Sequence, residues 1–419
     1  MQTGFATRPA IVFDAASTDD VVSVVSYAAE AGLPVGVQAT GHGVPGSSEG
    51  GVLIVTRRMA AVRIDPGART ATIAAGARWG QVAEAAAAHG LAPLNGSAPS
   101  VGAVSYTLGG GLGILGREFG YAADHVRSLD VVTADSVPRH VTADGDPELF
   151  WGLLGGGANL GVVTELEIGL VPVARLYGGA LAFDGDEVDP AAVLRGYEEW
   201  TRTLPDEVTS SLAALVYPDL PGLPPHLKGR HLVQIRVAST GSAAEGERLV
   251  APLRGLGPTV SDTLREMPYT ESPTIHGDPD FPHAYYGDNR LLSGLDVAAA
   301  GEILALTGRA APSMQILQIN HLGGALSRPA PNAVPHREAQ WLIRILSPLD
   351  GTDVAALREL HAEAFGRVAP RTLGRSLNFL YGGNDRTEGL YDPETLKRLA
   401  ALKATYDPAN LFRRNYNVL

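Results

Sequence analysis

The sequence predicts an α+β fold of two domains. The chain has 419 residues, more than a single hydrophobic core usually serves, so two domains are the starting expectation. Residues 1–173 mix short strands and helices with glycine-rich loops, whereas residues 174–370 alternate strands and helices, as in an antiparallel sheet covered by helices. Residues 371–419 then provide a helix and a turn.

Composition and charge narrow the classes of partner. Glycine occurs 50 times, well above its usual share of about 7%, so part of the chain uses glycine for backbone geometry. The formal net charge is −12 and there is no long basic run, which argues against nucleic acid and an anionic membrane as partners. The lack of cysteine excludes disulfides, thiolate metal ligands and a cysteine nucleophile, and we expect no metal ion.

The sequence also predicts where the protein works. Residues 1–7 do not combine a charged segment with an apolar run, so they do not have the pattern of a signal peptide. No stretch approaches the roughly eighteen apolar residues of a membrane span. We therefore expect a cytoplasmic protein.

The first elements form a βαβ-like opening. A strand is predicted at residues 10–13, and Ser17 then caps a helix that ends at Gly32. A second strand, at residues 34–38, leads directly into the glycine-rich loop of residues 39–46. The loop thus lies at the carboxyl end of a strand, where ligands of α/β folds usually bind.

This loop holds a single imidazole among glycines, as Thr40-Gly41-His42-Gly43. Glycines leave main-chain N–H groups free to surround an anion, because no Cβ stands in the way. Taken alone, however, these residues fit a surface turn with an incidental histidine better than a ligand site. The choice depends on the rest of the chain.

A second glycine-rich stretch contains a misleading motif. Strands are predicted at residues 52–56, 61–64 and 70–74 and a helix at 78–89, before glycines gather between residues 96 and 116. Gly111-x-Gly113-x-x-Gly116 matches a dinucleotide-binding fingerprint, with Asp130 and Asp135 near the expected distance. Ser105-Tyr106-Thr107 stands where that fingerprint needs an apolar strand, so we reject the NAD interpretation.

The remaining elements are predicted from periodicity. In the first part these are a strand at 126–133, a helix at 147–154, a glycine loop at 155–161 and a strand at 162–168. In the second part, strands are predicted at 211–217, 231–238, 314–322 and 340–346, with helices around 190–203, 243–253 and 353–366. Residues 268–290, rich in Pro, His, Tyr and Asp, are expected to form a long active-site loop. A last helix is expected around residues 394–403.

Taken in order, the motifs of this chain resemble those of one family, the FAD-linked oxidoreductases of the vanillyl-alcohol oxidase or PCMH type, and within it the berberine-bridge-enzyme-like and 6-hydroxynicotine-oxidase-like group. The resemblance covers nearly the whole chain. The motifs that carry it are Thr40-Gly41-His42, Pro99-Ser100-Val101-Gly102, Gly109-Gly110-Gly111-Leu112-Gly113, Tyr121-Ala122-Ala123-Asp124-His125-Val126, Glu148-Leu149-Phe150-Trp151, Gly161-Val162-Val163-Thr164-Glu165, His321-Leu322-Gly323-Gly324, Pro335-His336-Arg337, Asn378-Phe379 and Tyr406-Asp407-Pro408-Ala409-Asn410-Leu411-Phe412-Arg413.

The resemblance implies a domain plan and a cofactor. Residues 1–173 would form a PCMH-type FAD-binding domain of two α+β subdomains, residues 174–370 an inserted substrate-binding domain, and residues 371–419 a return to the FAD-binding domain. The residues expected to bind FAD are Thr40, Gly41, His42, Gly43, Val101, Gly102, Gly109, Gly110, Gly113, Val163 and Asn378.

The resemblance also implies how FAD is attached. In the family, the histidine of the first loop often bonds to the C8 methyl group of the flavin, and a cysteine beside the second loop can add a bond at C6. Here His42 is present, Ala98 stands at the cysteine position, and Thr40 replaces a usual glycine. We therefore expect one covalent bond at most, through His42. Val101 resembles the residue that admits oxygen to the flavin, although it could equally pack there for shape alone.

The usual catalytic bases of the family are missing. Their positions are occupied by Ser376 and, in a less secure alignment, by Ile343. A serine hydroxyl, with a pKa far above neutral, cannot take a proton unaided. The residues expected near the reaction are Asn378, Tyr106, Tyr121, His321 and Tyr381, with Tyr217, Tyr286 and Arg290 as further candidates in the substrate domain. Each could instead be a structural residue.

Three functions remain open from the sequence. The first is an FAD-dependent oxidase that takes hydride from a small, natural-product-like molecule of secondary metabolism, with O2 as acceptor. The second is a redox-neutral cyclisation in which the flavin is mainly structural. The third is a binding protein without turnover. The resemblance permits a monomer or a homodimer.

Overall fold

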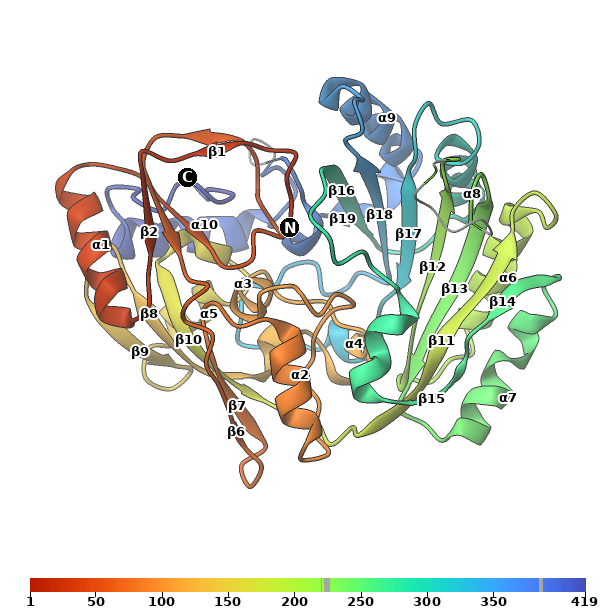
Figure 1. Cartoon of the computed structure of the whole chain (residues 1–419), viewed down its shortest axis with the longest axis horizontal. Helices are drawn as coiled ribbons and strands as arrows, with labels where there is room; N and C mark the ends of the chain where they lie inside the picture. The colour runs from red at the N-terminus through yellow and green to blue at the C-terminus, as the bar shows by residue number, and fades with distance from the viewer. Residues whose placement is uncertain (220, 222–226, 384–386) are drawn as a thin grey trace.

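The structure is a computed structural model that describes residues 1–219, 221, 227–383 and 387–419. Figure 1 shows two lobes side by side. The N-terminal lobe holds strands β1 to β10 and helices α1 to α5, and the sheet lobe holds β11 to β19 and α6 to α9. The last helix, α10 (Pro393–Tyr406), packs on α5 (Pro147–Leu153) of the N-terminal lobe. The tail therefore returns to the first part of the fold, and the α+β prediction is confirmed.

A small parallel sheet begins the N-terminal lobe. Its order is β2 (Ile11–Asp14), β5 (Val52–Val55) and β3 (Val35–Gln38). The helix between β2 and β3 is α1 (Thr18–Glu30), whose first turn is capped by the Ser17 side chain. The βαβ-like opening is therefore confirmed, with β5 inserted between its two strands. A second parallel pair joins β1 (Thr7–Arg8) to β4 (Ser48–Glu49).

An antiparallel sheet of five strands forms the rest of this lobe. Its order is β6 (Val62–Asp65), β7 (Thr70–Ala74), β10 (Val162–Gly169), β8 (Val126–Val132) and β9 (Pro138–Thr142). Packed on it are α2 (Trp79–Ala87), α3 (Ala103–Leu108) and α5, whereas α4 (Gly116–Phe119) contacts β12 (Val208–Val216) of the sheet lobe. A helix, α3, and not a strand, precedes Gly109. The structure thus confirms that the Gly111-x-Gly113-x-x-Gly116 motif is not a dinucleotide fingerprint.

The sheet lobe is built on one antiparallel sheet of nine strands. Along the sheet the order is β14, β11, β13, β12, β17, β18, β16 and β19, with β15 also paired to β11. The strand bounds are β11 (Arg175–Asp184), β12 (Val208–Val216), β13 (His231–Ser239), β14 (Thr259–Asp262), β15 (Arg265–Pro268), β16 (Tyr285–Leu292), β17 (Ile316–His321), β18 (Trp341–Pro348) and β19 (Thr372–Gly374).

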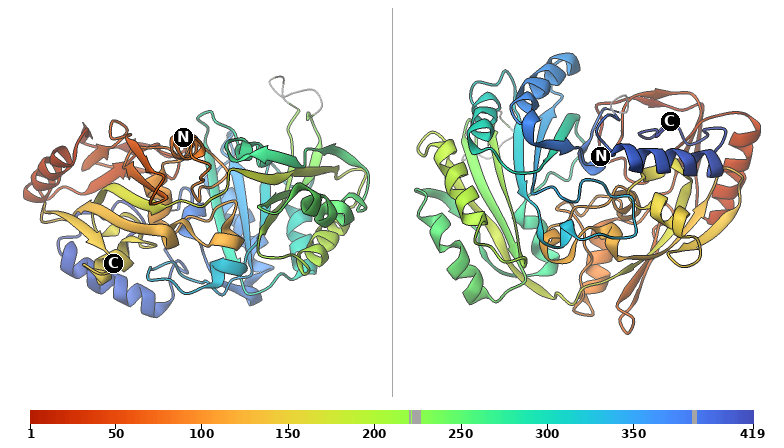
Figure 2. Two further views of the ribbon diagram at one scale, coloured as in Figure 1. Left: turned by 90° about the horizontal axis from the view of Figure 1, so that it is seen from below. Right: turned by 180° about the vertical axis from the view of Figure 1, so that it is seen from behind.

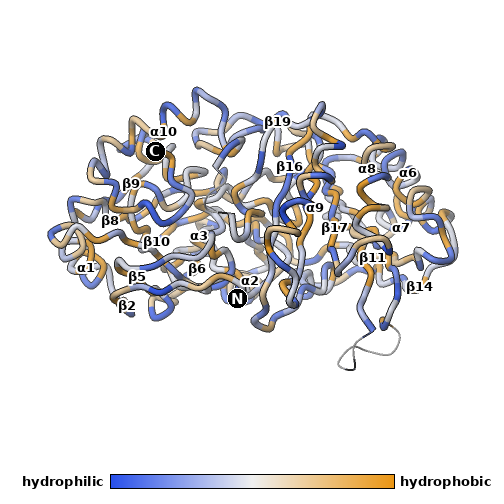
Figure 3. Tube along the Cα trace, turned by 90° about the horizontal axis from the view of Figure 1, so that it is seen from above, coloured by the Kyte–Doolittle hydropathy of each residue, from blue (hydrophilic) through white to orange (hydrophobic). Residues whose placement is uncertain are grey.

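Helices cover one face of this sheet (Figure 2). They are α6 (Pro190–Thr201), α7 (Ala243–Arg254), α8 (Val297–Leu306) and α9 (Val354–Gly366), and alternate residues of the strands pack against them in an apolar core. Figure 3 shows apolar segments in both lobes, interspersed with polar ones. The opposite face of the sheet looks toward the N-terminal lobe. No helix formed by the described residues combines the length and the apolar character that a bilayer crossing requires.

The prediction of a long loop at residues 268–290 was wrong. The 3-10 helix η3 (Tyr269–Ile275) and the first part of β16 occupy most of it, and only the segment between them is irregular. Strand β16 was missed because its centre carries the polar residues Asp288, Asn289 and Arg290. These are buried with partners, since Asp288 pairs with the Arg290 side chain at 3.0 Å. Tertiary pairing inside the sheet therefore overrides the polar composition.

A buried ion pair fastens the tail to the N-terminal lobe. The Lys403 ammonium donates to Asp407 at 2.9 Å and to the carbonyl of Asn159 at 2.9 Å, and both charged side chains are fully buried. Asp407 also accepts from the main-chain N–H groups of Leu411 and Phe412. The Tyr-Asp-Pro motif of the tail is thus a structural turn, held by one carboxylate with several donors.

Removing one member of this pair leaves the other charge buried without compensation, which costs about 3–5 kcal/mol. We expect Lys403→Met to lower the free energy of unfolding by roughly that amount. Lys397→Met is the matched control, because Lys397 is exposed on the same helix. Urea denaturation of both variants checks this, and equal midpoints would show that the pair does not stabilise the fold.

Candidate functional site

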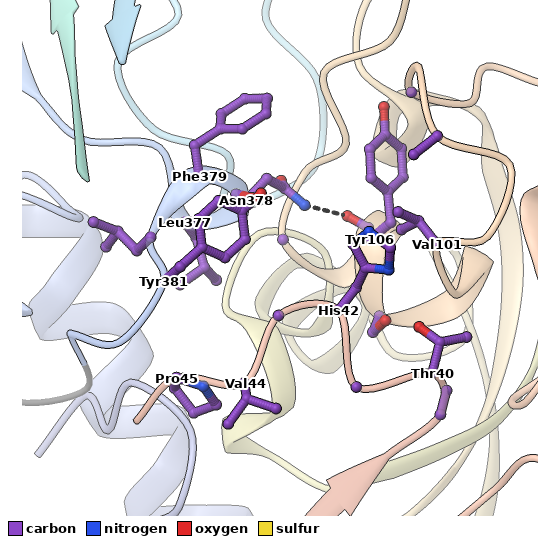
Figure 4. A pocket seen from close by; sticks show the side chains of 18 of the residues that line it. Thr40, His42, Val44, Pro45, Val101, Tyr106, Leu377, Asn378, Phe379 and Tyr381 are labelled. Atoms are coloured by element: carbon purple, nitrogen blue, oxygen red, sulfur yellow. Dashed lines mark hydrogen bonds between the residues drawn. The ribbon is translucent and has the colours of Figure 1, made fainter. Parts of the chain in front are cut away.

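A cavity of about 450 Å³ lies between the two lobes. The segments that line it include the loop after β3, the region of α3, the tail, and the face of the nine-stranded sheet that the helices leave open. In Figure 4, His42, Val101 and Tyr106 come from one side of the cavity, and Leu377, Asn378, Phe379 and Tyr381 from the other. The site thus joins segments that are more than 300 residues apart in sequence.

The first glycine loop presents unused donors to the cavity. Among the described residues, no protein acceptor receives a hydrogen bond from the main-chain N–H groups of Thr40, Gly41, His42 or Gly43. Gly41 has a φ of +70°, which favours glycine. The Tyr285 hydroxyl fixes the loop by donating a hydrogen bond to the His42 carbonyl at 2.7 Å. The result is a fixed concave run of N–H groups, the geometry of an anion site.

The His42 imidazole is neutral at physiological pH. Burial, together with the charge of the neighbouring Met1 amino group, lowers its pKa to about 4. Neutral imidazole keeps a ring nitrogen with a free lone pair. The side chain can therefore act as a nucleophile without first losing a proton.

Asn378 joins the tail to the second glycine-rich stretch. Its side-chain amide donates to the Tyr106 carbonyl at 2.9 Å and accepts from the Gly111 N–H at 3.0 Å (Figure 4). A Cβ on Gly109 would lie 2.9 Å from both the nitrogen and the oxygen of that amide. Glycine at position 109 is thus required by the approach of Asn378, and Asn378 in turn fixes the end of α3.

Most of the residues predicted to bind the cofactor line this cavity. Those that do are Thr40, Gly41, His42, Gly43, Val101, Gly109, Gly113, Val163 and Asn378. Gly102 and Gly110 lie beside the wall and shape its backbone: a Cβ on Gly102 would meet Ala39 at 3.3 Å, and Gly110 has a φ of +105°. The loop residues are therefore brought together as the sequence predicted.

The predicted catalytic residues divide into two groups. Tyr106 and Tyr381 line the cavity along with Asn378. Burial raises the pKa of both phenols above their usual range, so both stay protonated at neutral pH. Tyr121 and His321 do not line the cavity, and the structure gives both of them structural partners.

Tyr121 belongs to a network that joins two of the sequence motifs. The Arg337 guanidinium lies over the Tyr121 ring and forms an ion pair with Asp124 at 2.5 Å. Asn332 completes the network by donating to Asp124 at 2.8 Å. The Tyr-Ala-Ala-Asp and Pro-His-Arg motifs are thus each other's structural partners.

His321 supports the buried Arg117. One ring nitrogen lies 3.1 Å from the Arg117 guanidinium, and burial together with that charge lowers the His321 pKa to about 3. The His321 ring also packs against Trp341. Arg117 further donates to the Val208 carbonyl at 2.9 Å, so these residues connect α4 to the sheet. We do not retain Tyr121 or His321 as catalytic candidates.

The two positions at which the family usually has a base also lie outside the cavity. Ile343 is fully buried among the helices on the covered face of the sheet, and its neighbour Arg344 takes the cavity-facing position. Ser376 lies beside a small second cavity behind Gly109. Of the further candidates, Tyr286 packs on His361 and Arg290 on Phe365, both against α9, and Tyr217 does not line the cavity.

Sequence reasoning missed the polar residues that the sheet contributes. Arg236 on β13 and Arg344 on β18 line the cavity, together with His276 and Asp278 from the segment after η3. The signal was present, because each arginine interrupts a strongly apolar strand, in His231–Ser239 and in Trp341–Pro348. A charged residue inside an apolar strand is rarely buried without a partner or a function.

Comparisons with known proteins agree with this geometry. A family model described as "FAD binding domain" matches residues 9–142, and one described as "Berberine and berberine like" matches residues 370–418. (R)-6-hydroxynicotine oxidase of Paenarthrobacter nicotinovorans is 30% identical over 98% of this chain and 91% of its own length. The chain belongs to the FAD-linked oxidoreductases of the berberine-bridge-enzyme-like group.

Solved structures extend the likeness to the whole fold of this FAD-linked oxidoreductase. The 6-hydroxy-D-nicotine oxidase from Arthrobacter nicotinovorans superposes with a TM-score of 0.85 at 28% identity, over 99% of this chain and 92% of that one. A glucooligosaccharide oxidase from Acremonium strictum superposes with a TM-score of 0.83 at 21% identity, over 99% of this chain and 92% of that one. The second likeness concerns the fold alone, and it supports the predicted PCMH-type architecture with its large antiparallel sheet.

The contact between Gly109 and Asn378 can be tested directly. We expect Gly109→Ala to displace the Asn378 amide and so leave the Tyr106 carbonyl and the Gly111 N–H without their partner, at a cost of about 1–3 kcal/mol. Gly294→Ala is the control, since its Cβ would meet nothing within 4 Å. Thermal denaturation and the flavin content of both purified variants check this. An unchanged midpoint and full flavin content in Gly109→Ala would contradict it.

Proposed function

We propose that this FAD-linked oxidoreductase takes a hydride from a small organic substrate and passes the electrons to O2, with FAD bound through His42. One observation carries the proposal: a single cavity places the loop of His42, Val101 and the Asn378 amide opposite a polar face of the nine-stranded sheet. In this proposal residues 1–173 and 371–419 hold FAD, and residues 174–370 hold the substrate.

The cavity offers hydrogen-bond donors and apolar walls that suit FAD. The unused N–H groups of residues 40–43 would hold the anionic diphosphate, and Arg414, at the tail end of the cavity, would add a positive charge. Val101, Gly109, Gly113 and Val163 would line the ring system. Bound FAD supplies the hydride acceptor that the protein itself lacks. Asn378 acts as a positioning residue, because both ends of its amide are used by the backbone.

Of the two tyrosines, Tyr106 would orient the substrate as a hydrogen-bond donor, whereas the Tyr381 hydroxyl already donates within the protein and would accept from the substrate. Tyr381 donates to the Asn378 carbonyl at 3.1 Å and packs edge-on against Tyr285. Tyr106 packs edge-on against Trp79, and its hydroxyl has no partner among the described residues. A buried hydroxyl without a partner is costly, which favours a ligand or water beside it.

The covalent bond through His42 is a separate part of the proposal. A neutral imidazole nitrogen would replace one hydrogen of the C8 methyl group: the C–H bond breaks, the protons are released, and the two electrons pass through the flavin to O2. Such a substituent raises the reduction potential of the flavin. We expect the yellow colour of the wild-type protein to stay with the precipitate after denaturation in acid. His42→Ala should release its colour to the supernatant, because it lacks the nucleophile. His283→Ala, another histidine of the cavity, is the control and should keep the colour in the precipitate. Colour in the wild-type supernatant would contradict covalent attachment and leave FAD binding intact.

Val101 would set the access of oxygen. It lines the cavity beside α3, and a larger side chain there would fill the space that O2 needs. We expect Val101→Leu to slow reoxidation of the photoreduced flavin by O2 by about tenfold or more, equivalent to roughly 1.4 kcal/mol. Reoxidation by an artificial dye that accepts electrons should change little. Stopped-flow measurements with both acceptors check this, and equal slowing with both would show that Val101 only packs against the ring.

The redox-neutral alternative is not favoured. The relatives and structural neighbours reported above are named as oxidases. The test is anaerobic mixing with a panel of small alcohols and amines. Bleaching of the flavin, followed by peroxide on admission of air, supports the oxidase. A substrate converted while the flavin stays oxidised and no peroxide forms would overturn it.

The proposal also covers the cellular location, the type of substrate and the assembly of the enzyme. The lack of cysteine fits a reducing compartment, so we place the enzyme in the cytoplasm. We propose a natural-product-like substrate from secondary metabolism and a monomer or a homodimer as the assembly. Cell fractionation and light scattering test location and assembly.

A further inference from the structure

Two arginines face the cavity from strands that are not neighbours. Arg236 lies on β13 and Arg344 on β18, with β12 and β17 between them. Alternate residues of both strands, among them Val233, Ile235, Ile343 and Ile345, pack into the core under the helices. Since side chains of a strand alternate between faces, the two arginines share the opposite face, which lines the cavity.

The strand register places polar residues between the two arginines. Arg236 is paired with Ser211 on β12, and Ser211 with Asn320 on β17. Gln318, two residues before Asn320, is paired with Arg344. The floor between the arginines is therefore polar, in a sheet whose other face is apolar.

Neither arginine has an anionic partner. Among the described residues, Arg236 bonds to Gln234 at 3.0 Å and to a ring nitrogen of His276 at 3.3 Å, and its Nε atom is buried without a partner. Arg344 donates to the Gln318 side chain and lies over the Phe379 ring, 4.4 Å from its centre. Most of the N–H donors of the two guanidinium groups are left free.

The local charge is positive. Burial lowers the pKa of Arg236, and the charge of Arg344 lowers it further. Asp278 opposes this shift, but no ion pair joins its carboxylate to either arginine, and it is hydrogen-bonded by the Ser97 hydroxyl. The neighbouring His276 is neutral, because burial and the Arg236 charge lower its pKa to about 3. A buried positive charge in excess of its counter-charges costs several kcal/mol unless an anion joins it.

We propose that Arg236 and Arg344 bind a carboxylate of the substrate, so that this enzyme oxidises a carboxylate-bearing molecule. The inference rests on the proposed function, since it sets the substrate against the sheet and the flavin against the glycine loops. The diphosphate of FAD has its own donors at residues 40–43 on the far wall, which leaves the two arginines for another anion. Guanidinium donors match the paired oxygens of a carboxylate, and Asn320 and Ser211 offer further contacts to the rest of the molecule.

The first experiment measures binding and needs no turnover. Benzoate and its neutral counterpart benzamide are titrated into the oxidised holoenzyme, and the flavin absorbance spectrum and calorimetry report binding. We expect benzoate to bind and benzamide to bind at least about tenfold more weakly. In Arg236→Met and in Arg344→Met, the affinity for benzoate should fall by about 10- to 100-fold, while the affinity for benzamide changes little. Arg265→Met, an exposed arginine of the same sheet that pairs with Glu271, is the control and should bind as the wild type does.

Two further measurements keep the proposal falsifiable. If either Met variant loses its flavin, the corresponding variant Arg236→Lys or Arg344→Lys is used instead. Lysine keeps the charge but lacks the paired donors of a guanidinium group. Each Lys variant should therefore weaken benzoate binding less than the Met variant at the same position. Sulfite titration and the reduction potential of each variant show whether the arginines act on the flavin. A change in sulfite affinity with unchanged benzoate binding would assign the arginines to the reduced flavin and overturn the proposal. Equal binding of benzoate and benzamide to the wild type would overturn it as well.

The experiments distinguish a failure of the carboxylate site from a failure of the proposed oxidase function. Arginine-dependent benzoate binding, without bleaching by any carboxylate-bearing alcohol or amine, supports the binding site and counts against the oxidase. Bleaching by neutral substrates alone, at rates that the arginine substitutions leave unchanged, supports the oxidase and overturns the carboxylate site.

Discussion

The Asn378 amide is the interaction on which the cavity depends. It donates to the end of α3 and accepts from the following glycine stretch, and thereby joins the tail of the chain to the middle of the N-terminal lobe. Position 109 is a glycine because a Cβ there would collide with this amide. The Tyr381 hydroxyl, three residues further along the chain, donates to the Asn378 carbonyl. The buried Lys403–Asp407 pair holds the same tail in place further along. An asparagine that resembled a catalytic residue in the sequence is thus the element that assembles the walls.

Several other motifs of the sequence also have a structural role. Asp124 and Arg337 pair with each other across more than 200 residues, and His321 supports Arg117 where α4 meets the sheet. These side chains fix the junction of the two lobes. The chemistry is left to the groups that line the cavity: the loop of His42, the tyrosines, and the arginines of the sheet. Rigid elements thus carry the site, while loops from both lobes meet over it.

The sequence predicted the glycine loops well, because a glycine with a free N–H is a local property that the residue itself reveals. It predicted the helices α1, α6, α7 and α9 to within a few residues for the same reason, as their caps and periodicity are local. It missed β16, whose Asp288 and Arg290 are satisfied only by tertiary partners, and it missed Arg236 and Arg344, whose meaning depends on which face of the sheet they occupy. Ile343, the less secure match to a usual base position, lies on the covered face of the sheet, whereas its neighbour Arg344 faces the cavity, because in a strand one residue reverses the face.

The most direct test of the account is a crystal structure of the purified yellow holoenzyme, soaked with benzoate. The account predicts the flavin ring between Val101 and the sheet, with continuous density from its C8 methyl carbon to the His42 ring, and benzoate oxygens within hydrogen-bond distance of Arg236 and Arg344. A flavin ring placed away from His42, or benzoate bound at a site that neither arginine touches, would contradict it.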